Sequence, residues 1–251
     1  MNAYENSKLG SGLKAGVAQI AVYNNIALNL EKISHYIELA TKEGIDCLCL
    51  PECSLTGYIR DFNQVDRNEI DKALDSVHSL ALRNKVNVIV GASRFEAGKI
   101  FNSAIVLLAD NAKLVYNKNF LTSFDKEYFV PGNKGLAFEI KRVKCGVLIC
   151  RDQNHPSLAR RYAEQGVKLI FILAAHYYPP HEAWEKVDKN KALPIARAVE
   201  NNVYVFKANT VGSQGSTISL GDSLIVDPQG LVISEADKVN EAILSYEVEV
   251  L

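Results

Sequence analysis

The chain has 251 residues, of which 48% are hydrophobic and 23% are charged, and its formal net charge is −1. This composition is typical of a globular protein, and a chain of this length buries a substantial core without disulfide bonds. Because acidic and basic residues are interspersed, the sequence lacks the basic stripe of proteins that bind nucleic acid or membrane surfaces, and we expect neither partner.

The N-terminal stretch MNAYENSKLGSGLK is polar and lacks the apolar segment of a signal peptide, and no apolar run is long enough to span a bilayer. The five cysteines are odd in number and lack the spacing of a disulfide scaffold, so we expect a cytoplasmic protein. Cys47, Cys49 and Cys53 lie close together, as in a metal site, but neither a second pair nor a histidine cluster completes one. We therefore expect two strand cysteines and a loop cysteine, without a metal.

In the first half of the chain, apolar runs alternate with amphipathic segments. Strands are predicted over 13–22, 45–52, 86–95, 102–110 and 113–121, and helices over 29–44 and 66–85. Gly44 ends the first helix. Turn signals at Gly98 and at 110–111 predict that the last three of these strands form an antiparallel meander.

The second half continues this pattern. Strands are predicted over 144–150, 167–175, 203–212, 222–233 and 242–250, and helices from Pro156 to near Gly166 and over 181–202. Pro194 predicts a kink or a restart in the second of these helices. We find no linker, repeat or composition break, so the sequence predicts a single domain over residues 1–251. Many strands with few helices indicate an α/β fold in which sheets pack on each other and helices lie outside.

Three predicted strands end in chemically reactive residues: Glu52, Lys118 and Cys150. In α/β folds reactive groups gather where strands end, because the scaffold is rigid there and opens to a cleft. Each residue also has a simpler explanation. Glu52 fits a solvated turn, Lys118 fits a strand lysine whose side chain reaches water, and Cys150 fits a small hydrophobic residue of the core. Only the combination of the three points to a catalytic site.

The sequences around these residues are more specific. They are LPECSLTGY (50–58), YNKNFLTSFDKEYFVPG (116–132) and GVLICRDQNHPSLARRYAEQG (146–166). In this order they resemble the three signature blocks of the nitrilase, or carbon–nitrogen hydrolase, superfamily. ARAVENNVYVFKAN (196–209) and GDSLIVDPQG (221–230) resemble two further blocks, so the resemblance spans nearly the whole chain.

The resemblance implies a four-layer α-β-β-α sandwich, in which two packed mixed β-sheets carry helices on their outer faces. It implies a homodimer or higher homo-oligomer, and neither a metal nor an organic cofactor. It also implies catalytic roles for Glu52, Lys118 and Cys150, with a supporting role for Glu127 in the segment FDKEYF.

These residue types suit the hydrolysis of a small linear amide or N-carbamoyl compound through a cysteine thioester. Glu52 would take the proton of the Cys150 thiol, whose pKa the positive charge of Lys118 would lower. Lys118 and the backbone N–H of Arg151 would stabilise the oxyanion. Glu52 would then protonate the leaving ammonia or amine and activate water. Glu127 would orient Lys118 or the substrate nitrogen.

Several residues are candidates for substrate binding. Family members that hold a substrate carboxylate have arginine where this chain has Asn154, so the sequence argues against carbamoyl amino acids. Arg151 is the alternative for that role, although its side chain equally fits a position in solvent. His176 and Tyr177, in the loop after the most apolar strand, and Tyr58 are the other candidates; for these aromatic residues, packing within the sandwich is the competing explanation.

Three other functions remain open at this stage. Nitrile hydrolysis belongs to the same family, and the sequence does not separate it from amide hydrolysis. A cysteine–histidine hydrolase would pair Cys150 with His155, His176 or His181, and Glu52 would then be dispensable. A non-catalytic binding protein with the same fold would need none of the three strand-end residues.

Overall fold

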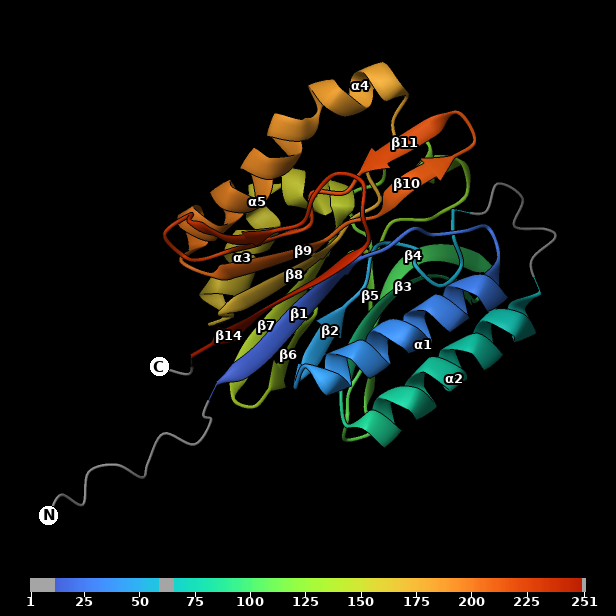
Figure 1. The fold of residues 1–251 in the computed structure, drawn as a ribbon, viewed down its shortest axis with the longest axis horizontal. Coiled ribbons are helices and arrows are strands. Elements are labelled where there is room, and N and C mark those ends of the chain that lie inside the picture. Colours follow the sequence, from blue (N-terminus) through green and yellow to red (C-terminus); the bar gives the residue numbers. More distant parts are fainter. Residues whose placement is uncertain (1–11, 59–65, 250–251) are drawn as a thin grey trace, which may run out of the picture.

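The structure is a computed structural model that describes residues 12–58 and 66–249 (Figure 1). Most of the polar N-terminal stretch, on which the expectation of no signal peptide rests, lies outside these residues, as does the last residue of the predicted strand 242–250. Within the described part, no helix is long and apolar enough to cross a membrane.

Strands and helices alternate along the chain largely as predicted. The first sheet contains β1 (Leu13–Gln19), β2 (Cys47–Cys49), β3 (Asn87–Glu96), β4 (Lys99–Leu107), β5 (Lys113–Asn117) and β14 (Ala242–Val248). The second contains β6 (Ala137–Ile140), β7 (Val143–Ile149), β8 (Leu169–Leu173), β9 (Tyr204–Ala208), β12 (Leu224–Val226) and β13 (Val232–Glu235). The remaining elements are the hairpin of β10 (Val211–Gln214) and β11 (Thr217–Leu220) and the helices α1 (Ile26–Lys42), α2 (Arg67–Asn84), α3 (Pro156–Glu164), α4 (Pro180–Glu185) and α5 (Val187–Asn201).

Both sheets are mixed. The first has the order β14-β1-β2-β3-β4-β5, in which β1, β2 and β3 are parallel and the other pairs are antiparallel. The second has the order β13-β12-β9-β8-β7-β6, in which β7, β8 and β9 are parallel. The predicted antiparallel meander is confirmed as β3-β4-β5.

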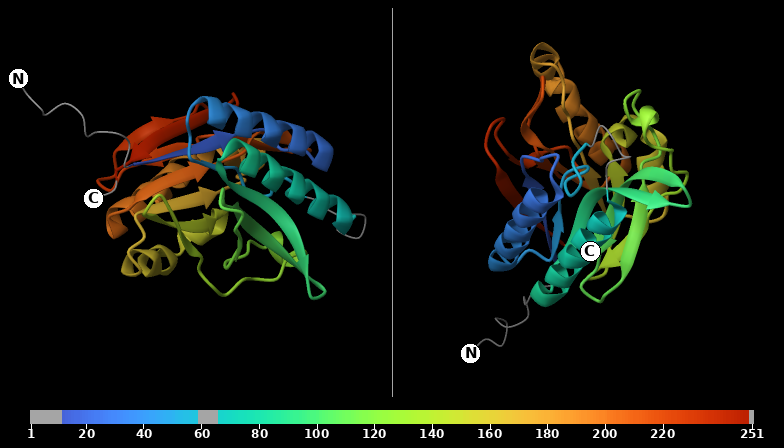
Figure 2. Two further views of the ribbon diagram at one scale, coloured as in Figure 1. Left: turned by 90° about the horizontal axis from the view of Figure 1, so that it is seen from below. Right: turned by 90° about the vertical axis from the view of Figure 1, so that its right-hand side faces the viewer.

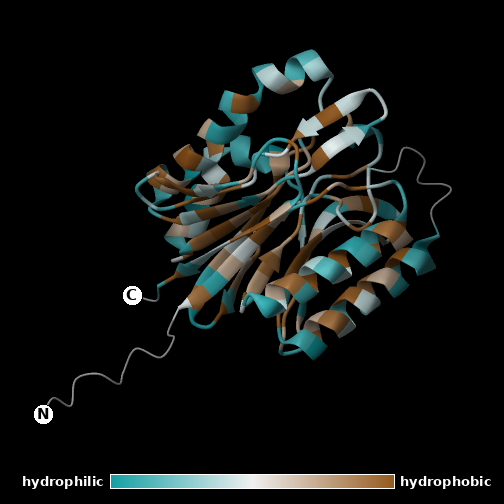
Figure 3. Ribbon diagram, in the orientation of Figure 1, coloured by the Kyte–Doolittle hydropathy of each residue, from teal (hydrophilic) through white to brown (hydrophobic). Residues whose placement is uncertain are grey.

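The sheets pack face to face, and helices cover their outer faces (Figures 1 and 2). One apolar cluster, which includes Ile89 and Phe171, fills the space between the sheets. A second, which includes Ile33, lies between the first sheet and helices α1 and α2. A third, which includes Leu148 and Ala198, lies between the second sheet and helices α3 and α5. Apolar colour follows the strands in Figure 3, whereas α1 and α2 also carry polar residues. The predicted four-layer α-β-β-α sandwich is thereby confirmed.

Helix α1 shows how the sequence specifies these layers. The Asn25 side chain accepts a hydrogen bond from the backbone N–H of Leu28 and caps the helix. Ile33, Ile37 and Ala40 follow at helical spacing and are buried against the first sheet. The helix therefore begins at Ile26, three residues before the predicted start.

Three predicted elements are interrupted. The predicted strand 222–233 is two antiparallel strands, β12 and β13. The predicted strand 203–212 ends as β9 at Ala208, because the backbone N–H of Asn209 donates to the hydroxyl of Ser223 and not to a neighbouring strand. The predicted helix 181–202 is two helices, but the second begins at Val187, and Pro194 lies inside it. Strand β6 and the β10–β11 hairpin were not predicted.

Candidate active site

Glu52 follows β2 in a tight turn that packs on β3. A Cβ atom at Gly91 would lie 2.4 Å from the carbonyl oxygen of Pro51 and 2.5 Å from the backbone nitrogen of Cys53, so only glycine fits at this point of β3. The backbone N–H of Glu52 donates to the carbonyl of Ala174, just after β8, at 3.3 Å. The two sheets are therefore joined at the residue that carries the carboxylate.

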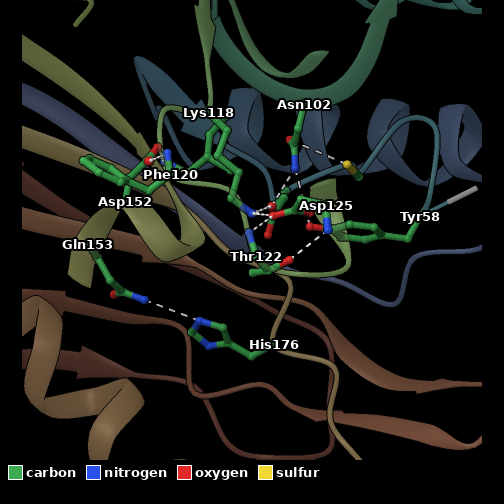
Figure 4. A network of polar contacts seen from close by, with 12 residues as sticks. Tyr58, Asn102, Lys118, Phe120, Thr122, Asp125, Asp152, Gln153 and His176 are labelled. Atoms are coloured by element: carbon green, nitrogen blue, oxygen red, sulfur yellow. Dashed lines mark hydrogen bonds and ion pairs between the residues drawn. The ribbon is translucent and has the colours of Figure 1, made fainter. Parts of the chain in front are cut away.

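Lys118 follows β5, and its ammonium group is buried between two carboxylates (Figure 4). Its Nζ lies 2.6 Å from Oε1 of Glu52 and 2.7 Å from Oδ2 of Asp125. Nδ2 of Asn102 also donates to Oε1 of Glu52, at 2.7 Å. The second carboxylate oxygen of Glu52, Oε2, is buried and has no hydrogen-bond partner among the described residues. Glu52 therefore keeps one oxygen free to accept a proton.

Cys150 follows β7 and is half-buried at the start of a short 3-10 helix, Cys150–Asn154. Its φ of 45° lies in the left-handed region, which strains a non-glycine residue by roughly 1–3 kcal/mol. Oδ2 of Asp152 holds this turn by accepting hydrogen bonds from the backbone N–H of Ile149 at 3.1 Å and from the hydroxyl of Tyr116 at 2.7 Å. Since Tyr116 lies in β5, the strained turn of the second sheet is fixed to the first sheet.

The other oxygen of Asp152 binds the segment after Lys118. Oδ1 accepts hydrogen bonds from the backbone N–H groups of Asn119 and Phe120 at 3.1 and 2.8 Å (Figure 4). Burial raises the pKa of Asp152 to about 6, although its hydrogen-bond donors lower it. This one buried carboxylate fixes the position of Cys150 relative to Lys118.

Burial and charge set the protonation states at the site. Burial raises the pKa of the Cys150 thiol well above its usual range, and Glu52 raises it further. Lys118 lowers this pKa, as expected, but does not outweigh burial. Burial alone would lower the pKa of Lys118, yet Glu52, Cys150 and Asp125 reverse the effect and raise it. The resting protein therefore has a neutral thiol and a charged lysine, so that nucleophilic attack by sulfur requires a base.

The structure corrects the predicted supporting residue. The side chain of Glu127 is exposed, and no hydrogen bond or ion pair joins it to Lys118 in the described part of the chain. Asp125 takes this place. The backbone N–H of Thr122 donates to Oδ2 of Asp125 at 2.9 Å, and the backbone N–H of Asp125 donates to the hydroxyl of Thr122 at 3.0 Å. This reciprocal cap sets the direction of the turn and points the first carboxylate of FDKEYF, not the second, at the lysine.

Tyr58 lies on the Glu52 side of the cluster. Its hydroxyl is 3.5 Å from Nδ2 of Asn102, and its ring is tilted against Phe124 with centroids 5.9 Å apart. Burial, and then the carboxylates of Glu52 and Asp125, raise the pKa of Tyr58 well above its usual range. Its position is consistent with substrate binding, which stays a prediction.

Arg151 and His176 have opposite environments. The side chain of Arg151 is exposed, so the structure does not place it in the site, and the solvent alternative holds. His176 is 6% exposed, and its Nε2 lies 3.4 Å from Nε2 of Gln153 (Figure 4). Burial lowers the pKa of His176 well below its usual range, so its ring is neutral.

Tyr177 and Tyr178 are adjacent in the loop after β8 but have different neighbours. Tyr177 lies near Thr210, and its buried hydroxyl has no hydrogen-bond partner among the described residues. Tyr178 interacts electrostatically with Cys150 and with Glu52. The substrate-binding role of Tyr177 stays a prediction, and Tyr178 is a second candidate for that role.

The histidine alternative has no support in the geometry. Across residues 12–58 and 66–249, no hydrogen bond joins a histidine to Cys150. His155 stacks on Phe120 with ring centroids 3.4 Å apart, and His181 is exposed. His176 contacts the Gln153 side chain, as described above.

The early cysteines lie in two environments. Cys47 and Cys49 are buried in the cluster between the sheets, and Sγ of Cys53 lies 3.7 Å from Oδ1 of Asn102. No group of three or more His, Cys, Asp or Glu side chains within the described residues is arranged to hold a metal ion.

Known proteins resemble this chain in sequence and in fold. The 2-oxoglutaramate amidase of Bacillus subtilis is 28% identical over 232 residues, which cover 90% of this chain and 86% of the relative. The nitrilase of Pyrococcus abyssi is 29% identical over 231 residues, which cover 88% and 83%. The fold is shared with an amidase from Nesterenkonia sp. AN1, which was solved as a cysteine-to-alanine variant in complex with butyramide. The two structures superpose with a TM-score of 0.84 at 22% sequence identity, and the match covers 94% of this chain and 90% of that chain.

The family itself is established by a match over nearly the full length. The sequence model that describes carbon–nitrogen hydrolases matches residues 14–250. The resemblance carried by the blocks around Glu52, Lys118 and Cys150 is thereby confirmed, and the chain belongs to the carbon–nitrogen hydrolase family.

Proposed function

We propose that this protein is an amidase that hydrolyses a small linear amide or N-carbamoyl compound through a thioester on Cys150. The observation that carries the proposal is the buried contact of Lys118 with Glu52 at 2.6 Å, which leaves Oε2 of Glu52 without a partner in the described part of the chain. Membership of the family and relatives named as amidases support cleavage of a carbon–nitrogen bond.

In the first step Sγ of Cys150 attacks the carbonyl carbon of the amide. The thiol proton passes to Oε2 of Glu52, the C–S bond forms, and the carbonyl π electrons move to oxygen. The Lys118 ammonium and the backbone N–H of Arg151 stabilise this oxyanion, and the loss of one such donor typically raises the barrier by about 3–4 kcal/mol. Asp125 keeps the lysine in place.

Collapse of the tetrahedral intermediate breaks the C–N bond. Glu52 gives its proton to the leaving nitrogen, and ammonia or an amine departs while the acyl group stays on sulfur. Water then attacks the thioester and gives a proton to Glu52. The C–S bond breaks, the acid leaves, and the proton returns to Cys150.

The test compares amides and nitriles of one carbon skeleton, for example butyramide and butyronitrile. We expect ammonia release from the amide and an acyl adduct in the intact mass of the wild type, but not of Cys150→Ala. Glu52→Gln should lose turnover while His155→Ala keeps it; the reverse pattern would support the cysteine–histidine mechanism. Faster release from the nitrile would identify a nitrilase, and a protein with neither turnover nor adduct would be a binding protein.

The family resemblance and the free cysteines bear on the assembly and the location of the protein. The family resemblance supports a homodimer or higher homo-oligomer, which light scattering on the purified protein tests. All five cysteines are free, which supports a reducing compartment such as the cytoplasm. A monomer at micromolar concentration would contradict the first of these proposals, and export of the tagged protein the second.

A further inference from the structure

Asn102 is a buried amide residue in β4, next to the segments that carry Glu52 and Lys118. The residue is 1% exposed, and the hydrogen-bond partners of its side chain all come from the segment 52–58. Its backbone carbonyl accepts a hydrogen bond from the backbone N–H of Lys118 at 2.9 Å. Asn102 therefore contacts both halves of the buried ion pair, the glutamate through its side chain and the lysine through its backbone.

The amide presents its donor side to Glu52. Nδ2 of Asn102 donates to Oε1 of Glu52 at 2.7 Å, and Nζ of Lys118 lies 2.6 Å from the same oxygen (Figure 4). Because the terminal torsion of a glutamate side chain has a broad energy profile, a single donor would leave the carboxylate free to rotate. Two donors on Oε1 fix its plane, and Oε2 is the oxygen left without a partner among the described residues.

Cys53, the residue directly after Glu52, fixes the direction of this amide. Sγ of Cys53 lies 3.7 Å from Oδ1 of Asn102. Burial raises the pKa of the Cys53 thiol well above its usual range, so the thiol keeps its hydrogen and is the donor in this contact. An amide turned the other way would place Oδ1 against the Glu52 carboxylate, so that two acceptors would face each other. Two neighbouring residues of the chain thus select one orientation of Asn102.

A simpler explanation is that Asn102 only satisfies polar groups of the core, as most buried amides do. Its contact with Glu52 is different in kind, because a hydrogen bond to a charged acceptor is about twice as strong as one between neutral groups. Its backbone contact with Lys118 does not depend on the side chain, and any residue at this position of β4 keeps it. The amide can therefore be removed while the lysine segment stays in place.

On the basis of the proposed amidase function, we propose that Asn102 is a positioning residue of the reaction. Together with Cys53 it holds Oε1 of Glu52 against Lys118, and this leaves Oε2 as the oxygen that takes the thiol proton of Cys150. Asn102 acts through Glu52 and does not touch the substrate.

The first test compares Asn102→Leu, which removes the amide at similar volume, with Asn87→Leu. The amide of Asn87 also has hydrogen bonds at both ends, to Asp46 and Ala109, but it lies at the start of β3. In the hydrolysis of butyramide, Asn102→Leu should lower kcat on the order of 10- to 100-fold and keep KM, because a displaced base slows the chemical step without changing substrate contacts. Asn87→Leu should keep both constants, although both variants lower the midpoint of urea unfolding.

The second test shows whether Asn102 acts through Glu52. Alkylation of Cys150 by iodoacetamide is followed by peptide mass spectrometry, at an alkaline pH where hydroxide also deprotonates the thiol, so that the rate stays measurable in Glu52→Gln. Asn102→Leu should slow this alkylation in the wild-type background and have no further effect in the Glu52→Gln background. A residue that only stabilises the fold would slow the reaction by the same factor in both backgrounds.

The outcomes separate the two proposals. If butyramide and related amides are not hydrolysed and no acyl adduct forms on Cys150, the amidase function fails, whereas the alkylation rates still test the coupling of Asn102 to Glu52. If butyramide is hydrolysed and Asn102→Leu keeps kcat, or slows alkylation equally in both backgrounds, the positioning role alone is overturned. Should Asn102→Leu not fold, Cys53→Ala takes its place: a several-fold lower kcat at the same KM supports the role, and an unchanged kcat contradicts it.

Discussion

Asp152 accepts a hydrogen bond from the backbone N–H of Phe120 at 2.8 Å and thereby joins two segments that carry different reactive groups. Cys150 lies two residues before Asp152, and Lys118 lies two residues before Phe120. The chain separates the sulfur from the ammonium by a long connection, yet one buried carboxylate sets their relative position.

Replacing Asp152 with asparagine should therefore displace Cys150 relative to Lys118, although neither reactive residue is changed. The new amide NH₂ would face a backbone N–H or the Tyr116 hydroxyl, where the carboxylate now accepts, and an unsatisfied buried donor destabilises by about 1–3 kcal/mol. We expect a lower midpoint of urea unfolding. We also expect the rate of Cys150 acylation to fall at least tenfold, because this rate depends on the position of the sulfur relative to the substrate. Asp71→Asn, at an exposed position of α2, is the control and should change neither.

Asp125 and Glu127 form a matched pair within one turn. Asp125→Asn removes a carboxylate that contacts Lys118 at 2.7 Å, so the lysine is less well held and its pKa falls. We expect kcat to decrease by 10-fold or more, on the scale of one lost oxyanion contact, in steady-state assays of amide hydrolysis. Glu127→Gln should leave kcat unchanged; a larger loss in Glu127→Gln than in Asp125→Asn would restore the prediction made from the sequence.

The adjacent tyrosines offer a second matched pair. Tyr178→Ala removes a ring that lines a small cavity beside His176 and should raise KM for the amide by roughly 10-fold, the effect of about 1.4 kcal/mol of lost contact. Tyr177→Ala removes a ring that faces Thr210 and should lower the melting temperature while keeping KM. Initial-rate kinetics and thermal unfolding on both variants distinguish the roles, and a KM effect in Tyr177→Ala alone would reverse the assignment.

Lys207, which is fully buried in β9, should make stability depend on alkaline pH. Its pKa in the folded protein, about 8, lies below the ordinary 10.5, so the unfolded chain binds the proton more tightly. The wild type should therefore lose stability as pH falls from about 10.5 to about 8, and no more below that, by roughly 3 kcal/mol in total. Lys207→Met has no such charge. As pH falls over this interval, its free energy of unfolding, measured with urea, should therefore increase relative to that of the wild type.

The charges around Lys207 define the control for that experiment. Asp222, Glu235 and Lys191 all act on its pKa, and so does Cys150, which is neutral until the pH is high. Lys191→Met alters one of these neighbours but leaves the buried ammonium in place. It should show the wild-type dependence on pH, and a flat profile for the wild type itself would mean that Lys207 is not a desolvated cation.

The alternation of apolar and amphipathic segments predicted packed sheets with helices outside, whereas the four-layer sandwich and the roles of Glu52, Lys118 and Cys150 were implied by the resemblance to the carbon–nitrogen hydrolase blocks. The sequence did not predict Asp125, since FDKEYF offers two carboxylates and the choice depends on the cap formed by Thr122. That choice depends on the direction of a single turn, for which residue type and spacing carry little information.

Lys207 was missed for a different reason. A lysine near the end of a strand, as in VYVFKAN, is typical of a side chain that reaches water. Its burial results from the way in which α5 covers β9, and the helix contributes only a backbone carbonyl, at Asn190. A backbone carbonyl leaves no trace in the residue types, so only the three-dimensional arrangement reveals the contact.

The left-handed backbone of Cys150 has a consequence for the inactive forms of the protein. Alanine at this position keeps a Cβ atom and the same unfavourable φ, whereas glycine adopts that φ freely. Cys150→Gly should therefore melt at a higher temperature than Cys150→Ala, although neither has a sulfur atom. Greater thermal resistance in a catalytically dead protein would show that the native chain tolerates local instability in order to present its nucleophile.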